Sequence, residues 1–341
     1  MLNNTIKRIA IVKLSAMGDI IHSMIALQFI KKKYPHIIID WFVEENFRGI
    51  LEHNPHIHAI YGINLKSIKS KKSEIVSQIA LIKTYSKNNY DLIIDAQGLV
   101  KSALVAKLLG KNIAGFSKTS IRERLASYFY KVKVDIAYDK NAIVRNAKVL
   151  SEPLEFVITQ EEIDTKEPFL FFQNESLIID EYFQTNKKNI VCVIGASWIS
   201  KMYSKEKFIK IINALDENAL ILWGNEFERT VATHIAAHSK ARVLPKLDLN
   251  TLKALIAKAD LVIGNDTGPT HAAWALNVPS ITIFGNTPGH RNTYETPINK
   301  IIESDSVVNP FKIDKKDLSI NKVDENSIIE LAKGLLYEKK N

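Results

Sequence analysis

The chain has 341 residues, of which 46% are hydrophobic, and it carries a net charge of +9. This length suits two domains, each with its own core, and no apolar run approaches the roughly 20 residues that cross a bilayer. The single cysteine, Cys192, lies inside an apolar run, so we expect no disulfide and a reducing compartment. Lys13 and Asp19 interrupt the first apolar run, and we therefore expect a cytoplasmic protein without an export signal.

Basic residues gather in the first half of the chain. They are Lys66, Lys69, Lys71, Lys72, Lys101, Lys107, Lys111, Lys118, Arg122 and Arg124. A surface of this charge suits anionic partners, whether nucleic acid, a membrane face or a phosphorylated acceptor. The chain has no aromatic-basic RNA motif and no zinc-finger spacing, which ranks nucleic acid below the other two.

Short apolar strands alternate with helices in the first half. We expect strands at 8–14, 37–43, 57–61, 92–95 and 113–116, and helices at 20–33, in the lysine-rich stretch before 92, and from 98 to about 109. Such an alternation predicts a parallel sheet covered on both faces.

A second series follows a charged stretch at 157–188, which we interpret as the domain junction with a short surface helix. Strands are expected at 190–194, 219–223, 242–244, 261–263 and 280–284, and helices at 205–215, 227–237, 249–257 and 269–276. We therefore predict an α/β chain with two Rossmann-like, doubly wound domains, residues 1–160 and 161–324, whose ligand lies in the cleft between them. A last amphipathic helix, at about 325–341, is expected to pack back on the first domain.

The loop Ser15–Asp19 joins the first strand to its helix. It lacks a GxGxxG pattern, which argues against a dinucleotide pyrophosphate at this place. Asp19 stands at the helix start. It is either an acid that the helix dipole favours there, or a general base at the carboxyl edge of the sheet.

The loop Gly264–His271 repeats this arrangement with more polar groups. Its two glycines permit close backbone approach, and the amides of Thr267 and Gly268 suit a diphosphate at the start of the helix. Asp266 and His271 can turn toward the same ligand. The simpler alternative is a capped helix with His271 in the core.

Three further groups are candidates of lower specificity. Lys201, in the loop after the 190–194 strand, is a solvated charge or the cation that balances a departing diphosphate. Glu226 and Glu228 are candidates for gripping ribose hydroxyls. Three histidines lie close together at 53, 56 and 58, but metal binding is poorly supported because HExxH, CxxC and DxD patterns are absent from the sequence.

Four segments, in order along nearly the whole chain, carry a family resemblance. They are Lys13–His22, Asp40–Glu45, Asp95–Ala103 and Asp266–His271. In these segments the chain resembles the lipopolysaccharide heptosyltransferases of glycosyltransferase family 9, which have the two-domain GT-B fold. The second and third segments favour heptosyltransferase I, which acts on the inner Kdo residue, over heptosyltransferase II.

The resemblance implies transfer of L-glycero-D-manno-heptose from ADP-heptose to Kdo-lipid A, with inversion and without a metal or other cofactor. By position, Asp19 would deprotonate the Kdo hydroxyl and Lys201 would contact the donor phosphates. The donor site would be lined by Ala196, Ser197, Glu228, Leu247, Asp266, Thr267, Gly268 and His271, with Glu228 on the nucleoside side and Leu247 against the adenine. The basic residues Lys66, Lys69 and Arg122 would face the carboxylates and phosphates of the acceptor. The basic first half also permits weak peripheral attachment to the cytoplasmic face of the inner membrane.

One departure from the family pattern concerns Ala196, which stands where relatives often carry a hydroxyl residue, so one phosphate or sugar contact is lost or replaced. Other readings also fit two α/β domains: heptosyltransferase II, a nucleotide-sugar epimerase or hydrolase, and a periplasmic-type binding protein. The fold alone does not choose among them.

Overall fold

The computed structural model of the chain describes residues 6–65, 74–173 and 177–338. The chain divides into two compact units, Met1–Phe171 and Phe172–Asn341, a boundary later than the one expected at 160. The helix α6 (Gln160–Asp164) therefore belongs to the first unit, where its Ile163 is buried. In the same unit, the Asn54 amide donates a hydrogen bond to the carbonyl oxygen of Phe169 at 3.3 Å.

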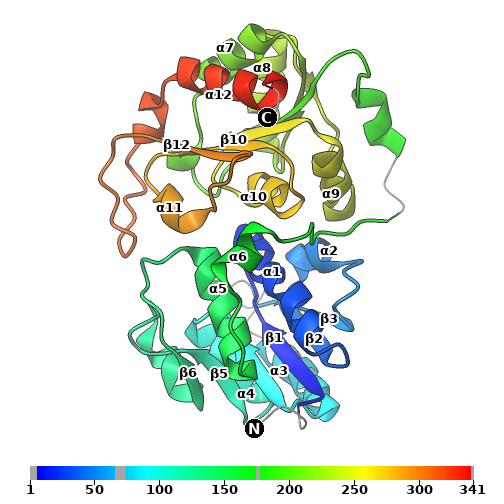
Figure 1. Cartoon of the computed structure of the whole chain (residues 1–341), viewed down its shortest axis with the longest axis vertical. Coiled ribbons are helices and arrows are strands. Elements are labelled where there is room, and N and C mark those ends of the chain that lie inside the picture. The colour runs from blue at the N-terminus through cyan, green and yellow to red at the C-terminus, as the bar shows by residue number, and fades with distance from the viewer. Residues whose placement is uncertain (1–5, 66–73, 174–176, 339–341) are drawn as a thin grey trace. The chain divides into compact units, whose positions relative to one another are not determined.

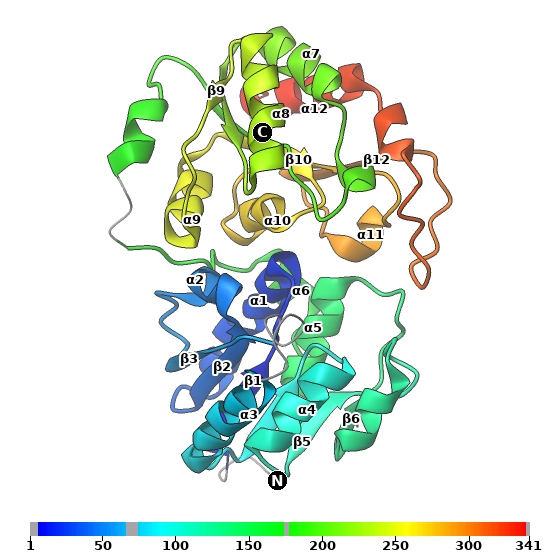
Figure 2. The same cartoon turned by 180° about the vertical axis from the view of Figure 1, so that it is seen from behind.

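The first unit is built on a parallel sheet with the strand order β3-β2-β1-β4-β5-β6. The strands are β1 (Arg8–Val12), β2 (Ile38–Glu44), β3 (Ala59–Ile63), β4 (Leu92–Asp95), β5 (Ile113–Phe116) and β6 (Val132–Val134). On one face α1 (Met17–Lys33) packs against α5 (Ala142–Ser151), and on the other α3 (Glu74–Tyr85) packs against α4 (Val100–Leu109), as Figures 1 and 2 show. The short helix α2 (Arg48–Leu51) precedes β3, and the 3₁₀ segment η4 (Arg124–Phe129) lies between β5 and β6.

The second unit repeats this plan with the order β12-β11-β10-β7-β8-β9. Its strands are β7 (Asn189–Val193), β8 (Asn218–Leu222), β9 (Arg242–Val243), β10 (Leu261–Asn265), β11 (Ser280–Phe284) and β12 (Asn299–Glu303). Its helices are α7 (Lys205–Leu215), α8 (Glu226–Ala237), α9 (Leu249–Lys258), α10 (Gly268–Ala275), α11 (Gly289–Asn292) and α12 (Glu325–Tyr337), with 3₁₀ turns at η7 (Ile199–Lys201) and η8 (Ser319–Lys322). Counted within its own unit, each sheet has the strand order 3-2-1-4-5-6 of a Rossmann fold.

Buried apolar strands and capped helix starts explain why these segments fold as they do. Every residue of β7, β8, β10 and β11 is buried, as expected for central strands of a sheet that is covered on both faces. Four helices of the second unit begin at a polar cap whose side chain accepts a backbone N–H bond. The caps are Ser204, Asn225, Asp248 and Asp324, before α7, α8, α9 and α12.

The last helix, expected at about 325–341 on the first domain, is α12, which ends at residue 337 and packs within the second unit instead. α12 packs against α7 of the second unit, where Ile328, Ile329 and Ala332 join the core. Glu325, at the start of α12, forms ion pairs with two lysines of α7, Lys207 at 3.0 Å and Lys210 at 2.6 Å. In Figure 1 the red helix accordingly lies beside the green α7.

The first unit contains a helix that packs in the same way: α5 has the position in the first unit that α12 has in the second. Each follows the sixth strand of its sheet, and each packs on the helix that follows the first strand. The crossover helices after the first two strands cover only part of that sheet face. A returning helix covers the fourth and fifth strands beside them, and α12 indeed contacts β10 and β11.

No helix among residues 6–65, 74–173 and 177–338 is long and apolar enough to cross a membrane.

Replacing Phe208 with alanine should destabilise the second unit. The Phe208 side chain on α7 is fully buried, and its ring meets that of Tyr203 edge to face at 5.6 Å. The cavity left by Phe208→Ala is expected to cost about 3–5 kcal/mol of unfolding free energy, which urea denaturation followed by circular dichroism measures. Phe227→Ala on α8 is the matched control, because that side chain is 56% exposed; equal losses in the two variants would contradict this account of the core.

Candidate functional site

The strand order fixes where each unit can bind a ligand. In a doubly wound sheet, the connections from the first and fourth strands leave toward opposite faces, and a crevice opens at the carboxyl ends of those strands. The pairs are β1 with β4 and β7 with β10. The loops that sequence analysis singled out, at 15–19, 195–201 and 264–271, all follow these strands.

In the second unit, the buried carboxylate of Asp266 gathers four side chains. Lys201 Nζ lies 2.5 Å from its Oδ2, and His271 Nε2 lies 3.0 Å from its Oδ1. Thr287 Oγ1 and Asn292 Nδ2 donate further hydrogen bonds to Oδ2 at 3.0 and 3.2 Å. Three of the predicted site residues therefore meet at one point.

The pKa of Asp266 is set by two opposing effects. Burial would raise it, but the Lys201 ammonium and the hydrogen bond with His271 outweigh burial and hold the pKa well below its usual range. Asp266 is therefore an anion at neutral pH. Its carboxylate fixes the positions of the cations and donors around it.

The start of α10 follows directly after this carboxylate. Thr267 is the N-cap and Gly268 the first residue of the helix. Free amides at a helix start attract phosphates. The Thr267 hydroxyl oxygen is buried and finds no hydrogen-bond partner among the described residues, so it remains available to a ligand.

A close approach of backbones explains Gly264 in this loop. A Cβ at this position would come within 2.5 Å of the Val193 side chain on β7 and 2.6 Å of the Thr270 hydroxyl. Glycine therefore lets β10 lie against β7 while α10 begins immediately after the strand.

The loop after β7 and the start of α8 form the neighbouring part of the site. Glu228 is buried, and its carboxylate accepts bonds from the Gly224 amide at 2.7 Å and the Asn225 side chain at 2.8 Å. A Cβ on Gly195 would lie 2.4 to 2.6 Å from this carboxylate, so the β7 loop and α8 are in direct contact. Ala196 is half-buried and Ser197 exposed in the same loop.

Two other predicted donor-site residues lie apart from these contacts. Leu247 is half-buried between β9 and α9, and Glu226 is exposed on the first turn of α8. Their proposed contacts with the nucleoside remain predictions.

Thr287 and Asn292 were not foreseen from the sequence. Both follow β11, the strand next to β10, in the segment Gly285–Asn292. The sequence did contain a relevant pattern, because a polar loop that follows a neighbouring parallel strand lies at the same edge of the sheet. Hydroxyl and amide residues are so common in loops, however, that this position alone did not identify them.

In the first unit, Asp19 lies exposed on the first turn of α1. One of its carboxylate oxygens accepts a bond from the Ala16 amide at 3.2 Å, which is the capping contact of the simpler reading. Gln97, after β4, accepts bonds from the Leu14 and Ser15 amides at 2.9 and 3.1 Å. The two loops of this switch point are thereby tied together, with Asp19 accessible beside them.

Another acid of the family segments, Asp95, has a structural role. It is fully buried and accepts bonds from the Gln97 and Gly98 amides, the Ser102 hydroxyl and the Tyr130 hydroxyl. Burial raises its pKa despite these four bonds.

The predicted acceptor residues lie partly outside what can be described. Arg122 is exposed just before η4. Lys66 and Lys69 fall outside the described residues.

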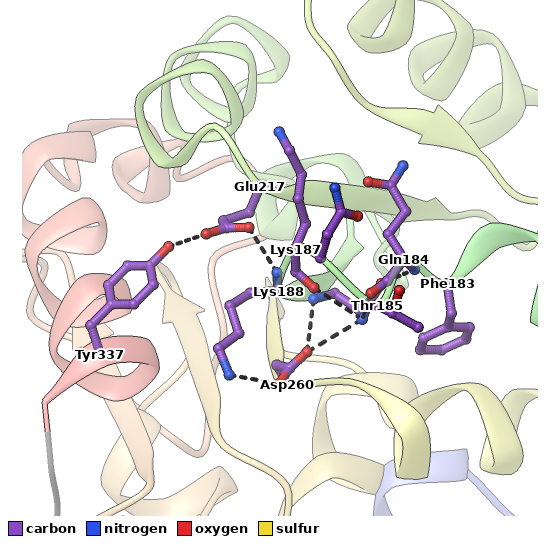
Figure 3. A pocket seen from close by; sticks show the side chains of 10 residues that line it. Phe183, Gln184, Thr185, Lys187, Lys188, Glu217, Asp260 and Tyr337 are labelled. Carbon is purple, nitrogen blue, oxygen red and sulfur yellow. Dashed lines mark hydrogen bonds and ion pairs between the residues drawn. The ribbon is translucent and has the colours of Figure 1, made fainter.

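A hollow in the second unit lies at the opposite end of the sheet, where β7, β8 and β10 begin (Figure 3). Its two acids are occupied by donors of the chain. Asp260 accepts bonds from the Asn189 amide at 2.8 Å and from Lys188 Nζ at 3.3 Å, and Glu217 contacts the Lys188 amide and the Tyr337 hydroxyl. Because ligands of such sheets bind at the carboxyl ends, we assign this hollow no ligand.

The three histidines of the first unit do not form a metal site in the part of the chain that the structure describes. His58 Nδ1 lies 3.0 Å from a carboxylate oxygen of Asp40, and the His56 ring packs edge to face on Phe171 at 6.4 Å.

Comparison with known proteins places this geometry in a family. The family model described as glycosyltransferase family 9 (heptosyltransferase) matches residues 78–319. The chain is 40% identical to the lipopolysaccharide heptosyltransferase 1 of Campylobacter coli, over 96% of this chain and 98% of that one. It is 30% identical to the protein of that name from Escherichia coli strain K12, over 83% and 89% of the two chains.

Solved structures agree. The E. coli heptosyltransferase WaaC with ADP superposes with a TM-score of 0.78 at 26% identity, covering 96% of this chain and 99% of that one. The same enzyme with ADP-2-deoxy-2-fluoro heptose gives 0.75 at 25% identity, with the same coverage. The predicted GT-B class of two Rossmann-like domains is confirmed, and the relatives favour heptosyltransferase I over heptosyltransferase II. The chain belongs to glycosyltransferase family 9, the heptosyltransferases, and is an enzyme of lipopolysaccharide core synthesis.

Proposed function

We propose that this heptosyltransferase moves L-glycero-D-manno-heptose from ADP-heptose to the Kdo residue of Kdo-lipid A. The observation that carries the proposal is the cluster at the start of α10, where Lys201, the helix amides and the unpartnered Thr267 hydroxyl lie beside Asp266. A diphosphate needs such cations and donors. Support comes also from the E. coli relative, whose structures contain ADP and a fluorinated ADP-heptose.

The donor would bind through its diphosphate at this cluster. Thr267 and Gly268 would donate to phosphate oxygens, and Lys201 would balance the charge that develops as ADP departs. Asp266 and His271 would keep that lysine in position and meet the heptose hydroxyls. Toward the nucleoside, Glu228 lies beside the β7 loop with Ala196 and Ser197, and Leu247 would contact the adenine.

Asp19 is our candidate for the general base. Its carboxylate is exposed at the carboxyl edge of the first sheet, and only one of its oxygens is used for capping. Inversion requires the acceptor oxygen to attack the anomeric carbon from the side opposite the leaving diphosphate, and the acceptor hydroxyl must lose its proton in that step. A base placed in this way contributes roughly 10²- to 10⁴-fold to the rate.

The acceptor is an anionic lipid, and the first unit has a surface suited to it. The outer stripe of α4 exposes Lys101, Leu104 and Lys107, and α4 packs against η4, which exposes Leu125 and Tyr128. Figure 2 shows α4 on the face turned toward the viewer. We propose that this face rests weakly on the anionic inner leaflet on the cytoplasmic side.

The charged groups of the acceptor would bind at the same surface. Arg122 is exposed next to η4, where it would meet the carboxylates or phosphates of the acceptor. The same role is proposed for Lys66 and Lys69.

Mass spectrometry of Kdo-lipid A incubated with ADP-heptose and the purified protein tests the proposed reaction. A mass increase of one heptose is expected, and none when the acceptor already carries that heptose. Transfer only to the heptosylated acceptor would identify heptosyltransferase II instead, and consumption of the donor without any acceptor would indicate a hydrolase.

Asp19→Ala should lose most of the transfer, about 10²- to 10⁴-fold in kcat, because the acceptor hydroxyl would keep its proton. The affinity for ADP-heptose, measured by titration calorimetry, should stay near that of the wild type. Asp139→Asn, an exposed acid elsewhere in the first unit, serves as control. A parallel collapse of donor affinity in the Asp19 variant would remove this residue from the base role.

Lys201→Ala should lower kcat about 10²-fold, because the leaving diphosphate loses a cation, and added Mg²⁺ should not restore the rate. Lys205→Ala, a partly exposed lysine four residues on, should behave like the wild type. The variant also leaves Asp266 buried without its ammonium partner, so its melting temperature is measured alongside. Full activity in a folded Lys201 variant would show that this lysine is not needed.

Leu125→Asp should weaken binding to vesicles of phosphatidylethanolamine and phosphatidylglycerol at least tenfold in a sedimentation assay, since it replaces a contact with the lipid by a repelled charge. Val157→Asp is the matched control, because Val157 is 74% exposed and Leu125 67%. Equal binding by both variants would argue against the α4–η4 surface.

A further inference from the structure

A long loop of the second unit, residues 304–318 between β12 and η8, contains no helix or strand but is well fastened. Its two arms are joined by the hydroxyls of Ser304 and Ser319 at 3.1 Å, and by the Ser306 hydroxyl, which donates to the Asp317 carboxylate at 2.7 Å. The loop is therefore held closed at its base.

Asn286, which follows β11, attaches this loop to the turn that carries Lys201. Its side chain is buried, and its Nδ2 donates to the carbonyl oxygen of Asp314 at 2.7 Å and to the Ser200 hydroxyl at 2.8 Å. One amide thus holds the far part of the loop against η7. Its Oδ1 is buried and finds no partner among the described residues.

The attachment brings a second lysine to the site. Lys315 Nζ lies 4.8 Å from the ring centroid of Trp198, and Lys201 Nζ lies 5.1 Å from the same ring. Because each distance is about 5 Å, the two ammonium groups are at most about 10 Å apart. Lys201 is paired with Asp266, whereas Lys315 has no ion pair within the described parts of the chain.

This arrangement brings two cations to one aromatic ring. Both ammonium groups lie near one indole and only Lys201 has an ion pair, while a cation on an exposed aromatic face gains only about 0.5–1 kcal/mol. The indole Nε1 of Trp198 is itself buried and has no partner among the described residues. Two cations and an unused donor are groups that suit an anion with several oxygens.

We infer that Lys315 is a second phosphate-binding lysine of the donor site, delivered by the 304–318 loop, with the Trp198 ring as its position when no nucleoside diphosphate is bound. The inference rests on the proposed function, in that the donor diphosphate binds at the start of α10. It adds a residue from a loop that lies far along the chain from Lys201. It also gives a role to Trp198, the aromatic residue beside Lys201. When the diphosphate binds, the Lys315 ammonium leaves the ring for a phosphate oxygen.

Calorimetric titration of the full chain with ADP and with adenosine tests the inference. Lys315→Ala should raise the Kd for ADP about fivefold to tenfold, the effect of losing one charge-assisted hydrogen bond near solvent, and leave the Kd for adenosine unchanged. Lys315→Arg should recover most of the ADP affinity. Lys316→Ala removes the same charge from the next position in the loop and should bind both ligands like the wild type.

Unchanged ADP affinity in Lys315→Ala, or an equal loss for ADP and adenosine, would overturn the inference. The result for Lys201→Ala separates this failure from failure of the proposed donor site. If that variant loses ADP affinity and Lys315→Ala does not, the donor site stands and Lys315 is excluded from it. If the wild type binds ADP no better than adenosine, the diphosphate site at α10 falls, and the role of Lys315 with it.

Discussion

One buried carboxylate organises the second unit's site. An unpaired charge in the position of Asp266 would be too costly to bury, so the fold must surround it with donors. These come from four separate segments: η7, the first turns of α10, the loop after β11, and α11. Breaking a buried pair of this kind typically costs about 3–5 kcal/mol. The same contacts that satisfy the acid therefore determine where Lys201 and the start of α10 lie, and with them the place where we propose that the donor binds.

Both units have the same order of strands and the same returning helix. A sheet with the order 3-2-1-4-5-6 gives its first and fourth strands divergent loops, and these loops carry Asp19 in one unit and Asp266 in the other. The helix that follows the sixth strand then returns to cover the open part of one face, as α5 and α12 do. The chemistry differs between the units because the loops differ: an exposed acid follows β1, and a cluster of cations and amides follows β7 and β10.

Much of this plan could be predicted from the sequence, and the failures have physical causes. Central strands and helices such as α7 were predicted within a residue or two because their apolar patterns are strong. The edge strands β6 and β12 were missed, since a three-residue VKV and the segment NKIIE are short and carry polar side chains. For α12 the amphipathic pattern revealed a buried face but not which surface it covers. Lys201 and Asp266 were singled out from their loops and again from the family resemblance, whereas Thr287 and Asn292 meet Asp266 only through tertiary folding.

The contact between Gly195 and Glu228 has a consequence for engineering. No side chain fits at position 195 while the glutamate occupies its present place, because even a methyl group would overlap the carboxylate. A shorter residue at 228 would release that space and free the amide of Gly224 as well. A substitution at 195 therefore requires the Glu228 side chain to move or to be shortened, so engineering that varies the two positions together samples combinations that single changes do not.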